Sequence, residues 1–330
     1  MSNNFIGFDL EGPLSPQDNA YELMKLFPQG DRIFEVISRY DDLLALEGRE
    51  GYEPGDTLAL IVPFLIHHGI SEKDIASLAE QATLVDGAPE LVARINSSGW
   101  QVFCVSTSYE QYAHRIAQRV GISPQNVACT RLPLERYRSL VAKTESTIME
   151  RIEQTILALS PGDNETMKRS LDRFFWEELP RVSVGIALAE VKPMGGQRKV
   201  EALKRFAQAY GQSLAQVAVV GDSITDVNML QAVNRAYGLA VAFNANEYAL
   251  PYATMGLAST NISDLSVVLE AWEKGGRHAV ERIVRERERA GTEGDRENFH
   301  WLAGRSDLKE PLKIHKKIRR LVREEAGKLG

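Results

Sequence analysis

The segment Phe5-Ile6-Gly7-Phe8-Asp9-Leu10-Glu11-Gly12 is an apolar run that leads straight into two acidic residues at a glycine. A second segment much later in the chain, Val219-Val220-Gly221-Asp222-Ser223-Ile224-Thr225-Asp226, repeats this arrangement. Carboxylates at the ends of buried parallel strands gather in the crevice where open α/β sheets bind their ligands. Oxygen-rich clusters of this kind suit Mg²⁺. We therefore expect Asp9 and Asp222 to converge on one divalent cation.

The composition is typical of a globular enzyme. The chain has 330 residues, of which 44% are apolar and 25% charged, and a formal net charge of −6. It contains no run of about 18 apolar residues, and its N-terminus lacks a basic region followed by an apolar segment. We expect one or two domains in the cytoplasm, with no membrane span. Cys104 and Cys129 lie in apolar strand-like runs without a CxxC pair, which indicates buried thiols.

Strand and helix patterns alternate along part of the chain, which predicts an α/β fold with a parallel sheet. We assign to this core domain residues 1–14, 86–130 and 185–265. Residues 15–85 read mostly as helices and have the position of a helical cap domain that closes over a cleft. Residues 131–184 carry two apolar stripes at helical spacing, separated by the turn-like segment Ser160–Asn164. This pattern predicts a helical hairpin insertion.

Residues 266–330 read as a helical C-terminal extension with a different charge. Residues 271–330 hold 16 Lys and Arg against 11 Asp and Glu, so they carry +5 and leave −11 on residues 1–270. The segment Lys313–Arg323 is a basic amphipathic helix, which could dock on an acidic partner, nucleic acid or an anionic membrane. We favour packing on the acidic body or a dimer contact, because charge runs are usually solvated faces. We expect no nucleic acid, and a homodimer or protein partner through the C-terminal helices.

Four short motifs carry a family resemblance. In chain order they are Asp9-Leu10-Glu11-Gly12, Ser106 after the apolar run Val102–Val105, Lys199 (with Lys192 as a competitor) at the start of a helix, and Gly221–Asp226. Together they resemble the haloacid dehalogenase-like (HAD) superfamily, nearest its phosphoserine phosphatase-type branch. The resemblance covers somewhat over a third of the chain. It implies a Rossmann-like core with a cap inserted after the first strand.

The resemblance implies an Mg²⁺-dependent phosphatase that forms an aspartyl-phosphate on Asp9. A phosphate monoester repels an anionic nucleophile, so attack needs a cation and fixed positive donors. Asp9, Asp222 and the Glu11 backbone carbonyl would hold the metal, and the Glu11 side chain would be the general acid and base. Lys199 would neutralise charge on the nucleophile and the phosphate. Asp226 would not bind the metal directly but would orient Lys199 or a metal-bound water molecule by a hydrogen bond.

The substrate is less determined than the reaction. Ser106 and Thr107, with Ser108 as a further candidate, would contact the phosphate. Asp18 stands where phosphoserine-type enzymes place a carboxylate for the substrate ammonium. Three cap residues could meet a substrate carboxylate, although cap salt bridges explain them at least as well: Arg32, Arg39 and Arg49. We expect a small phosphorylated metabolite.

Plainer interpretations stay open for each motif. The aspartates could cap helix starts, Ser106 could be a turn hydroxyl, and Lys199 could be a solvated helix lysine. The adjacent pair His67-His68 suggests a metal site, but neighbouring helix residues point in different directions, which favours a structural role.

Glu11 departs from the family pattern, in which this position is usually Asp. Misplacement of a catalytic group by about 1 Å can cost roughly 10²-fold in rate. We favour retained activity over a protein that binds phosphate but no longer hydrolyses efficiently.

Two rival functions follow from other features. The opening Asp9–Leu14, with Asp18-Asn19-Ala20 after it, also resembles a little-characterised, largely archaeal HAD group. Some members of that group are named as a subunit of an energy-converting hydrogenase, which implies at most a possible partner. The Glu11 departure and the +5 charge of the C-terminal segment motivate the first rival, a catalytically weak or inactive accessory subunit of a larger complex. The second rival is a metal-free dehalogenase that uses Asp9 on a haloacid, against which Asp222 and Asp226 argue.

Overall fold

The computed structural model describes residues 4–140, 146–160, 162–290 and 297–323. Strands in these residues form one seven-stranded sheet: β1 (Phe5–Phe8), β2 (Gln101–Tyr109), β3 (Val127–Thr130), β4 (Val217–Gly221), β5 (Leu239–Phe243), β6 (Met255–Ser259) and β7 (Glu297–Trp301). Their order across the sheet is β3-β2-β1-β4-β5-β6-β7. All neighbours are parallel except β6 and β7. The predicted α/β class with a mostly parallel sheet is confirmed.

The inner strands are apolar on both faces. Every residue of β1, β4, β5 and β6 is buried, because helices cover both sides of a parallel sheet. The chain runs from β1 to β2 on one side and later enters β4 on the other. This reversal leaves a crevice at the carboxyl ends of β1 and β4. Phe8 pairs with both Cys104 and Val220, so Asp9 and Asp222 follow at the same edge of the sheet.

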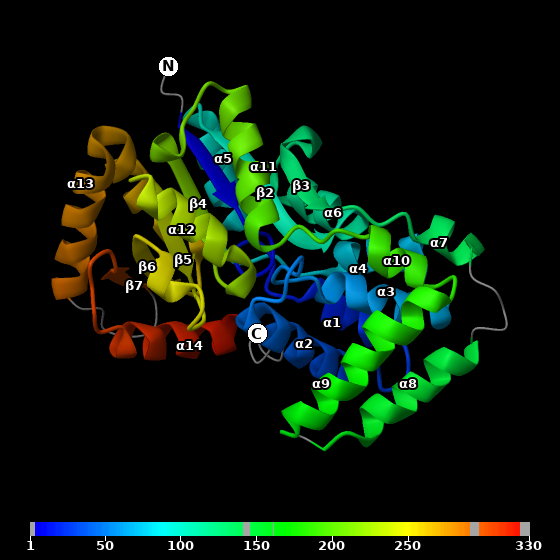
Figure 1. Cartoon of the computed structure of the whole chain (residues 1–330). Helices are drawn as coiled ribbons and strands as arrows, with labels where there is room; N and C mark the ends of the chain where they lie inside the picture. Colours follow the sequence, from blue (N-terminus) through cyan, green and yellow to red (C-terminus); the bar gives the residue numbers. More distant parts are fainter. Residues whose placement is uncertain (1–3, 141–145, 161, 291–296, 324–330) are drawn as a thin grey trace.

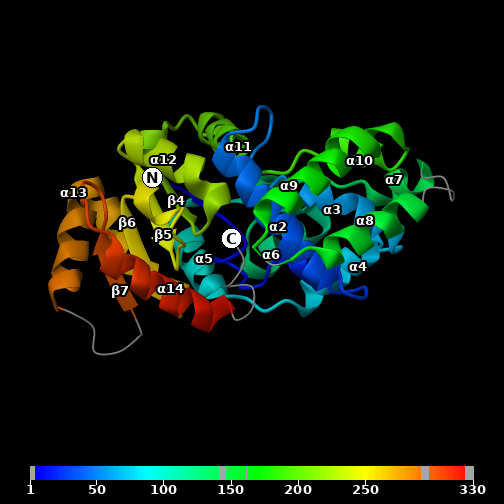
Figure 2. The same cartoon turned by 60° about the horizontal axis from the view of Figure 1, so that its bottom comes forward.

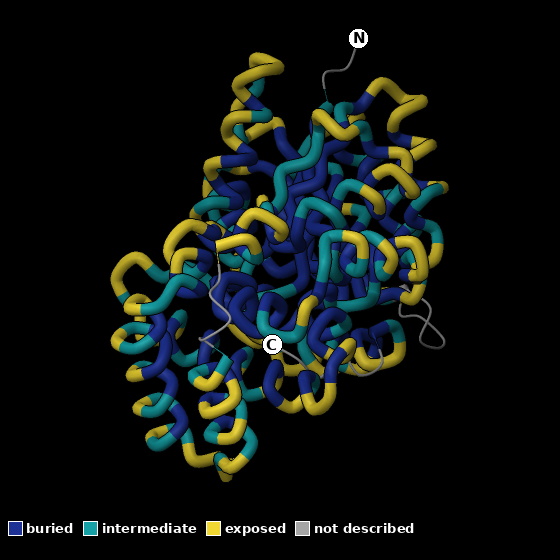
Figure 3. Tube along the Cα trace, turned by 90° about the vertical axis from the view of Figure 1, so that its right-hand side faces the viewer, coloured by how far each residue is buried: buried dark blue, intermediate teal, exposed yellow. Residues whose placement is uncertain are grey.

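Helices pack on the two faces of the sheet, as Figure 1 shows. They are α5 (Ala88–Ser97), α6 (Glu110–Val120), α11 (Gly196–Ala209), α12 (Val227–Arg235) and α13 (Ser266–Ala290). Figure 3 shows that buried residues concentrate at the centre of the molecule, while exposed residues line the outer faces of the helices.

Two groups of four helices form a lobe beside the sheet (Figures 1 and 2). Those of the predicted cap are α1 (Asn19–Met24), α2 (Gly30–Glu47), α3 (Thr57–His67) and α4 (Glu72–Gln81). Those that follow β3 are α7 (Leu134–Leu140), α8 (Ser146–Ala158), α9 (Asn164–Arg173) and α10 (Gly185–Glu190). Helix α10 contacts α3, so the helices that follow β3 extend a few residues past 184. The division of the chain into core, cap, insertion and extension domains stays a prediction.

Polar contacts join the two groups of helices in this lobe. Arg39 Nε donates to Asn164 Oδ1 at 2.6 Å, and Arg49 Nη1 lies 2.9 Å from Asp172 Oδ1. Arg32 lines a groove beside α8 and α9. His68 Nε2 lies 2.7 Å from Glu153 Oε1 and thereby links α3 to α8. None of the three arginines lines the sheet-edge cleft, and Arg39 and Arg49 contact the helices that follow β3. The ligand atoms of His67, His68 and Glu153 lie within 4.8 Å of one another, so the two histidines do not point apart as expected, and their structural role stays a prediction.

The C-terminal extension is not wholly helical, which corrects the prediction for residues 266–330. Strand β7 pairs antiparallel with β6, with Phe299 opposite Leu257, and extends the sheet. Phe299 and Trp301 are buried against the core, and aromatic residues favour strands. A five-residue strand beside a long helical pattern is easily missed, because helical periodicity dominates the surrounding sequence.

The last described helix, α14 (Lys309–Arg323), packs on the body of the protein. It contacts β6, Ile318 is fully buried, and the buried His315 Nδ1 accepts from the Ala245 N–H at 3.0 Å. His315, Arg319 and Arg323 are spaced i, i+4, i+8 and are all buried, so one polar stripe of this basic helix faces inward. The helix therefore packs on the body of the protein, which was one of the two alternatives that we favoured for it. A dimer or partner contact stays a prediction.

Within the described residues, no helix combines the length and the apolar character that a membrane crossing needs.

Candidate active site

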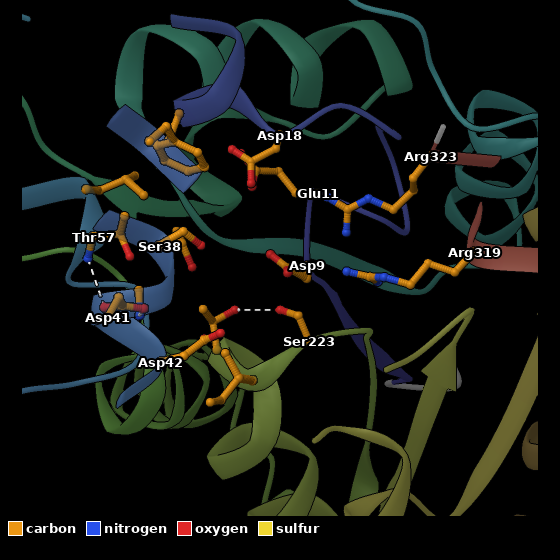
Figure 4. Close-up of a pocket in the computed structure, with 17 residues that line it drawn as sticks. Asp9, Glu11, Asp18, Ser38, Asp41, Asp42, Thr57, Ser223, Arg319 and Arg323 are labelled. Atoms are coloured by element: carbon orange, nitrogen blue, oxygen red, sulfur yellow. Dashed lines mark hydrogen bonds between the residues drawn. The ribbon is translucent and has the colours of Figure 1, made fainter. Parts of the chain in front are cut away.

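A small cleft opens at the crevice between the sheet and the helical lobe (Figure 4). The residues that line it are Asp9, Glu11, Asp18, Ala20, Phe34, Ser38, Asp41, Asp42, Gly55, Thr57, Leu58, Thr107, Ser223, Ile224, Thr225, Arg319 and Arg323. Its volume is about 90 Å³, well below the roughly 300–1,000 Å³ of pockets for drug-sized ligands. As it stands, the cleft admits only a small chemical group.

Lys199 joins two of the predicted carboxylates behind the cleft. Its Nζ lies 2.8 Å from Asp9 Oδ1 and 2.7 Å from Asp226 Oδ1, and its side chain is 0% exposed. Burial alone would lower the pKa of Lys199, but the Asp226 and Asp9 carboxylates outweigh burial and raise it. Lys199 is therefore a cation. The competitor Lys192 is exposed and lines a separate groove near α10.

The donor set at the centre of the cleft fits a hard divalent cation. Asp9, Asp222 and Asp226 each offer a carboxylate oxygen, and these oxygens lie within 4.8 Å of one another. Asp222 Oδ1 is buried and has no hydrogen-bond partner among the described residues. A buried oxygen without a donor is costly unless a ligand satisfies it. Carboxylate oxygens are the ligands that Mg²⁺ prefers, so Asp9 and Asp222 would hold it.

Asp226 has a supporting place in this cluster. Its Oδ1 accepts from Lys199, and its Oδ2 accepts from the backbone N–H groups of Asp222 at 2.9 Å and Ser223 at 3.2 Å. Both oxygens are thus occupied by protein donors. Asp226 caps the turn after β4, as the plainer interpretation holds, and at the same time fixes the position of Lys199.

Glu11 lies in the cleft, and its carboxyl group is a weaker acid than an ordinary glutamate. Its Oε1 accepts from the Ser108 hydroxyl at 2.5 Å and from the Asn19 N–H at 3.1 Å. Both donors converge on Oε1, and Oε2 has no hydrogen bond to another described residue. Burial, reinforced by the nearby Asp18 charge, raises the pKa of Glu11 to about 7. A carboxyl group with this pKa can give and take a proton near neutral pH.

Asp18 lines the cleft and also caps a helix. Its Oδ1 accepts from the Tyr21 N–H at 2.9 Å at the start of α1. Burial raises the pKa of Asp18. Its position is thus compatible both with the capping role and with the predicted contact to a substrate.

The predicted phosphate contacts divide between the cleft and the core. Thr107 lines the cleft, and its hydroxyl donates to the Met194 carbonyl at 3.1 Å. Ser106 is fully buried and does not line the cleft. Its Oγ accepts from the Ser108 N–H at 3.1 Å. Ser106 therefore makes a local contact within β2, while Thr107 lines the cleft and the Ser108 hydroxyl reaches the cleft residue Glu11.

The loop between α2 and α3 covers one side of the cleft. Glu53 Oε2 accepts from the Gln197 N–H at 2.9 Å, and Asp56 forms an ion pair with Arg198 at the start of α11. Gly55 has φ +94°, and a Cβ atom there would lie 2.8 Å from Thr107 Cγ2. The loop therefore needs glycine at this close approach, and its contacts keep the entrance narrow.

Two cleft residues on α14 were missed from the sequence. Arg319 and Arg323 each place a guanidinium Nη1 on Asp222 Oδ2, the latter at 2.7 Å. The sequence did hold a signal for them. Arg319 and Arg323 are spaced i, i+4 and continue the line of His315, and a helix that only faces solvent does not need such a polar stripe.

Asp41 was also missed. It is buried, it accepts from the Tyr52 hydroxyl at 2.6 Å and the Thr57 N–H at 3.0 Å, and burial raises its pKa to about 7.

Replacing Lys199 with Met will lower the free energy of unfolding by about 3–5 kcal/mol, because it leaves buried carboxylates without their cation. Urea denaturation of metal-free protein measures this loss. Lys204→Met is a matched control, since Lys204 is exposed on the same helix and its loss should change stability by no more than about 0.5 kcal/mol. A loss below about 1 kcal/mol for Lys199→Met would contradict a charged Lys199 as the partner of both aspartates.

Comparisons with known proteins bear on the family and the fold of the chain. The model of a family described as haloacid dehalogenase-like hydrolase matches residues 134–268. The structure of gene product AF1437 from Archaeoglobus fulgidus is 31% identical, with a TM-score of 0.87 over 99% of each chain. Two phosphoserine phosphatase structures share the fold with TM-scores of 0.53. The first, a phospho-aspartyl intermediate analogue, is 17% identical and covers 81% of this chain and 99% of its own. The second, a substrate complex, is 16% identical and covers 81% of this chain and 98% of its own. A comparison with curated protein sequences finds no match.

Proposed function

Because the chain belongs to the haloacid dehalogenase-like hydrolases, we propose that it is an Mg²⁺-dependent phosphatase that hydrolyses a small phosphorylated metabolite. The observation that carries the proposal is the arrangement around Asp9. This carboxylate lies at the cleft, 2.8 Å from the Lys199 ammonium and in one cluster with Asp222, whose buried Oδ1 has no hydrogen-bond partner among the described residues. A location in the cytoplasm belongs to the same proposal.

In the first step an Asp9 oxygen attacks the phosphorus of the substrate. The Asp9 O–P bond forms, the bond from phosphorus to the leaving oxygen breaks, and the proton of Glu11 goes to that oxygen. In the second step Glu11 takes a proton from water, which attacks the same phosphorus. The bond from phosphorus to the Asp9 oxygen breaks, which releases inorganic phosphate and leaves Asp9 ionised and Glu11 protonated, as at the start.

The cluster around Asp9 supports this chemistry electrostatically. Burial and the neighbouring Asp226 charge raise the pKa of Asp9, and the Lys199 ammonium opposes that rise. Lys199 therefore favours the ionised nucleophile and offsets its repulsion with phosphate. A bound Mg²⁺ would supply further positive charge for the phosphoryl oxygens. The small volume of the cleft supports a small substrate, which the loop between α2 and α3 would have to admit.

Removing divalent metal will abolish the activity. We expect phosphate release from p-nitrophenyl phosphate to fall to background in EDTA and to return when excess Mg²⁺ is added, because the carboxylate cluster then regains its cation. A panel of phosphorylated metabolites, assayed for free phosphate, would identify the substrate.

The same assay separates the rival functions. Turnover of a haloacid that survives EDTA would favour the metal-free dehalogenase, and an isomeric phosphorylated product in place of free phosphate would indicate a mutase. No phosphate release from any substrate, together with purification as a stable complex with other subunits, would favour the accessory role.

A further inference from the structure

The C-terminal helix α14 places two buried cations in the cleft. Arg319 is 3% exposed and Arg323 is 7% exposed, yet both line the cleft. Figure 4 shows their guanidinium groups extending from α14 toward Asp9 and Glu11. Both groups contact Asp222 Oδ2, and Arg323 Nε also donates to the Pro16 carbonyl at 3.0 Å.

These arginines change the charge of the centre. Without them, three carboxylates (Asp9, Asp222 and Asp226) face the single ammonium of Lys199, and the metal-free cluster carries −2. Such a cluster repels an anion at short range in a medium of low dielectric constant. The two guanidinium groups bring the total to zero. A net charge of zero matters for binding, because a phosphate monoester is a dianion and a negative cluster would repel it.

Both arginines also keep unused hydrogen-bond donors. Arg319 uses Nη1, and Arg323 uses Nη1 and Nε. Among the described residues, none accepts from Arg319 Nε or Nη2 or from Arg323 Nη2. A guanidinium group presents its donors in a fixed planar fork that matches the oxygens of phosphate. The free edges of the two groups are therefore suited to an oxyanion in the cleft.

The pair is held rigidly by its helix. His315, one turn before Arg319, accepts a hydrogen bond from the backbone of Ala245, Ile318 is fully buried, and Lys316 Nζ lies 2.8 Å from Glu247 Oε1. Donors fixed before the ligand arrives cost no ordering when it binds. Helix α14 thus forms part of the cleft wall through two side chains that are held in place before any ligand binds.

We propose that Arg319 and Arg323 form an oxyanion-binding pair that receives the phosphate group of the substrate, which makes α14 part of the active site. That the anion is a substrate phosphate rests on the proposed phosphatase function. The oxyanion site itself does not, since it can be measured without turnover.

Isothermal titration of the full-length protein with inorganic phosphate in EDTA tests the pair. We expect the double variant Arg319→Met/Arg323→Met to bind phosphate at least tenfold more weakly than the wild type. Arg320→Met is the matched control, because Arg320 is the exposed neighbour on the same helix, and its phosphate affinity should be unchanged. Equal affinity of the double variant and the wild type, or an equal loss in the control, would overturn the proposal.

A second comparison removes the buried counter-charge of the pair. Asp222→Asn keeps an oxygen for the arginines but leaves the metal-free cluster at +1, so phosphate should bind about fivefold more tightly than to the wild type. Adding Arg319→Met/Arg323→Met to Asp222→Asn should erase this gain. This pair of variants leaves no unpaired Asp222 charge and keeps the test decisive if the first double variant does not fold. If Asp222→Asn and the triple variant bind phosphate with equal affinity, the oxyanion site is disproved, whether or not the protein hydrolyses phosphate esters.

Discussion

Asp9→Asn will eliminate phosphate release, with kcat reduced at least about 10³-fold, because an amide cannot serve as the nucleophile that forms the aspartyl-phosphate. The substitution preserves shape. Asp9 Oδ1 accepts from the Leu10 N–H at 2.7 Å, and the amide oxygen of Asn can accept the same bond. Activity on p-nitrophenyl phosphate with Mg²⁺ gives the rate, and acid quenching followed by mass spectrometry detects the phosphorylated residue.

Two controls give this result its meaning. Asp86→Asn makes the same chemical change at an exposed position and should leave kcat unchanged. Unfolding of Asp9→Asn should remain cooperative, which shows that the lost rate does not reflect a lost fold. A rate within tenfold of the wild type, or a phosphorylated residue elsewhere in the chain, would show that Asp9 is not the nucleophile.

Glu11→Gln will reduce kcat/KM for an alkyl phosphate by about 10²–10⁴-fold. Gln can still accept the hydrogen bonds from Ser108 and Asn19, but it cannot transfer a proton to the leaving oxygen. The reduction should be smaller for p-nitrophenyl phosphate, whose leaving group needs little protonation. The ratio of the two losses is the measurement, with Glu22→Gln on the neighbouring helix α1 as a control that should change neither.

The pH profile reports on the same group. Burial raises the pKa of Glu11 to about 7, so the carboxyl group is protonated below that pH and ionised above it. As the general acid of the first step, Glu11 must be protonated in the free enzyme. We therefore expect kcat/KM for an alkyl phosphate to fall as pH rises through about 7, and the fall to be absent in Glu11→Gln. A flat wild-type profile between pH 6 and 8 would argue against Glu11 as the acid.

The sequence allowed the core and the central carboxylates to be predicted, for a clear physical reason. Fully buried parallel strands need continuous apolar runs, and an acidic residue directly after such a run has little reason to be there unless the sheet edge uses it. Asp9 and Asp222 carry this signal. Their proximity then follows from the register of β1 and β4. The burial of Lys199 beside both Asp9 and Asp226 was within reach only because a motif pointed to it.

Other features depend on contacts that local patterns do not encode. Arg323 reaches Asp222 across 101 residues of sequence, and a basic helix gives the same periodicity whether its charged stripe faces solvent or a buried carboxylate. Strand β7 owes its place to β6 and to the burial of its aromatic side chains. The pKa of Glu11 depends on how fully its surroundings exclude water, which is a property of the tertiary structure.

The bond between Arg323 and Pro16 spans 307 positions of the chain, which has a consequence for biosynthesis. A ribosome that adds about 5–20 residues per second needs roughly 15–60 s to travel from one partner to the other. During this interval the first strand and its acidic loop exist without the guanidinium groups that balance them. The parallel strands β1 to β6 can therefore assemble before α14 exists, but the proposed anion-binding pair is completed only once α14 has been translated.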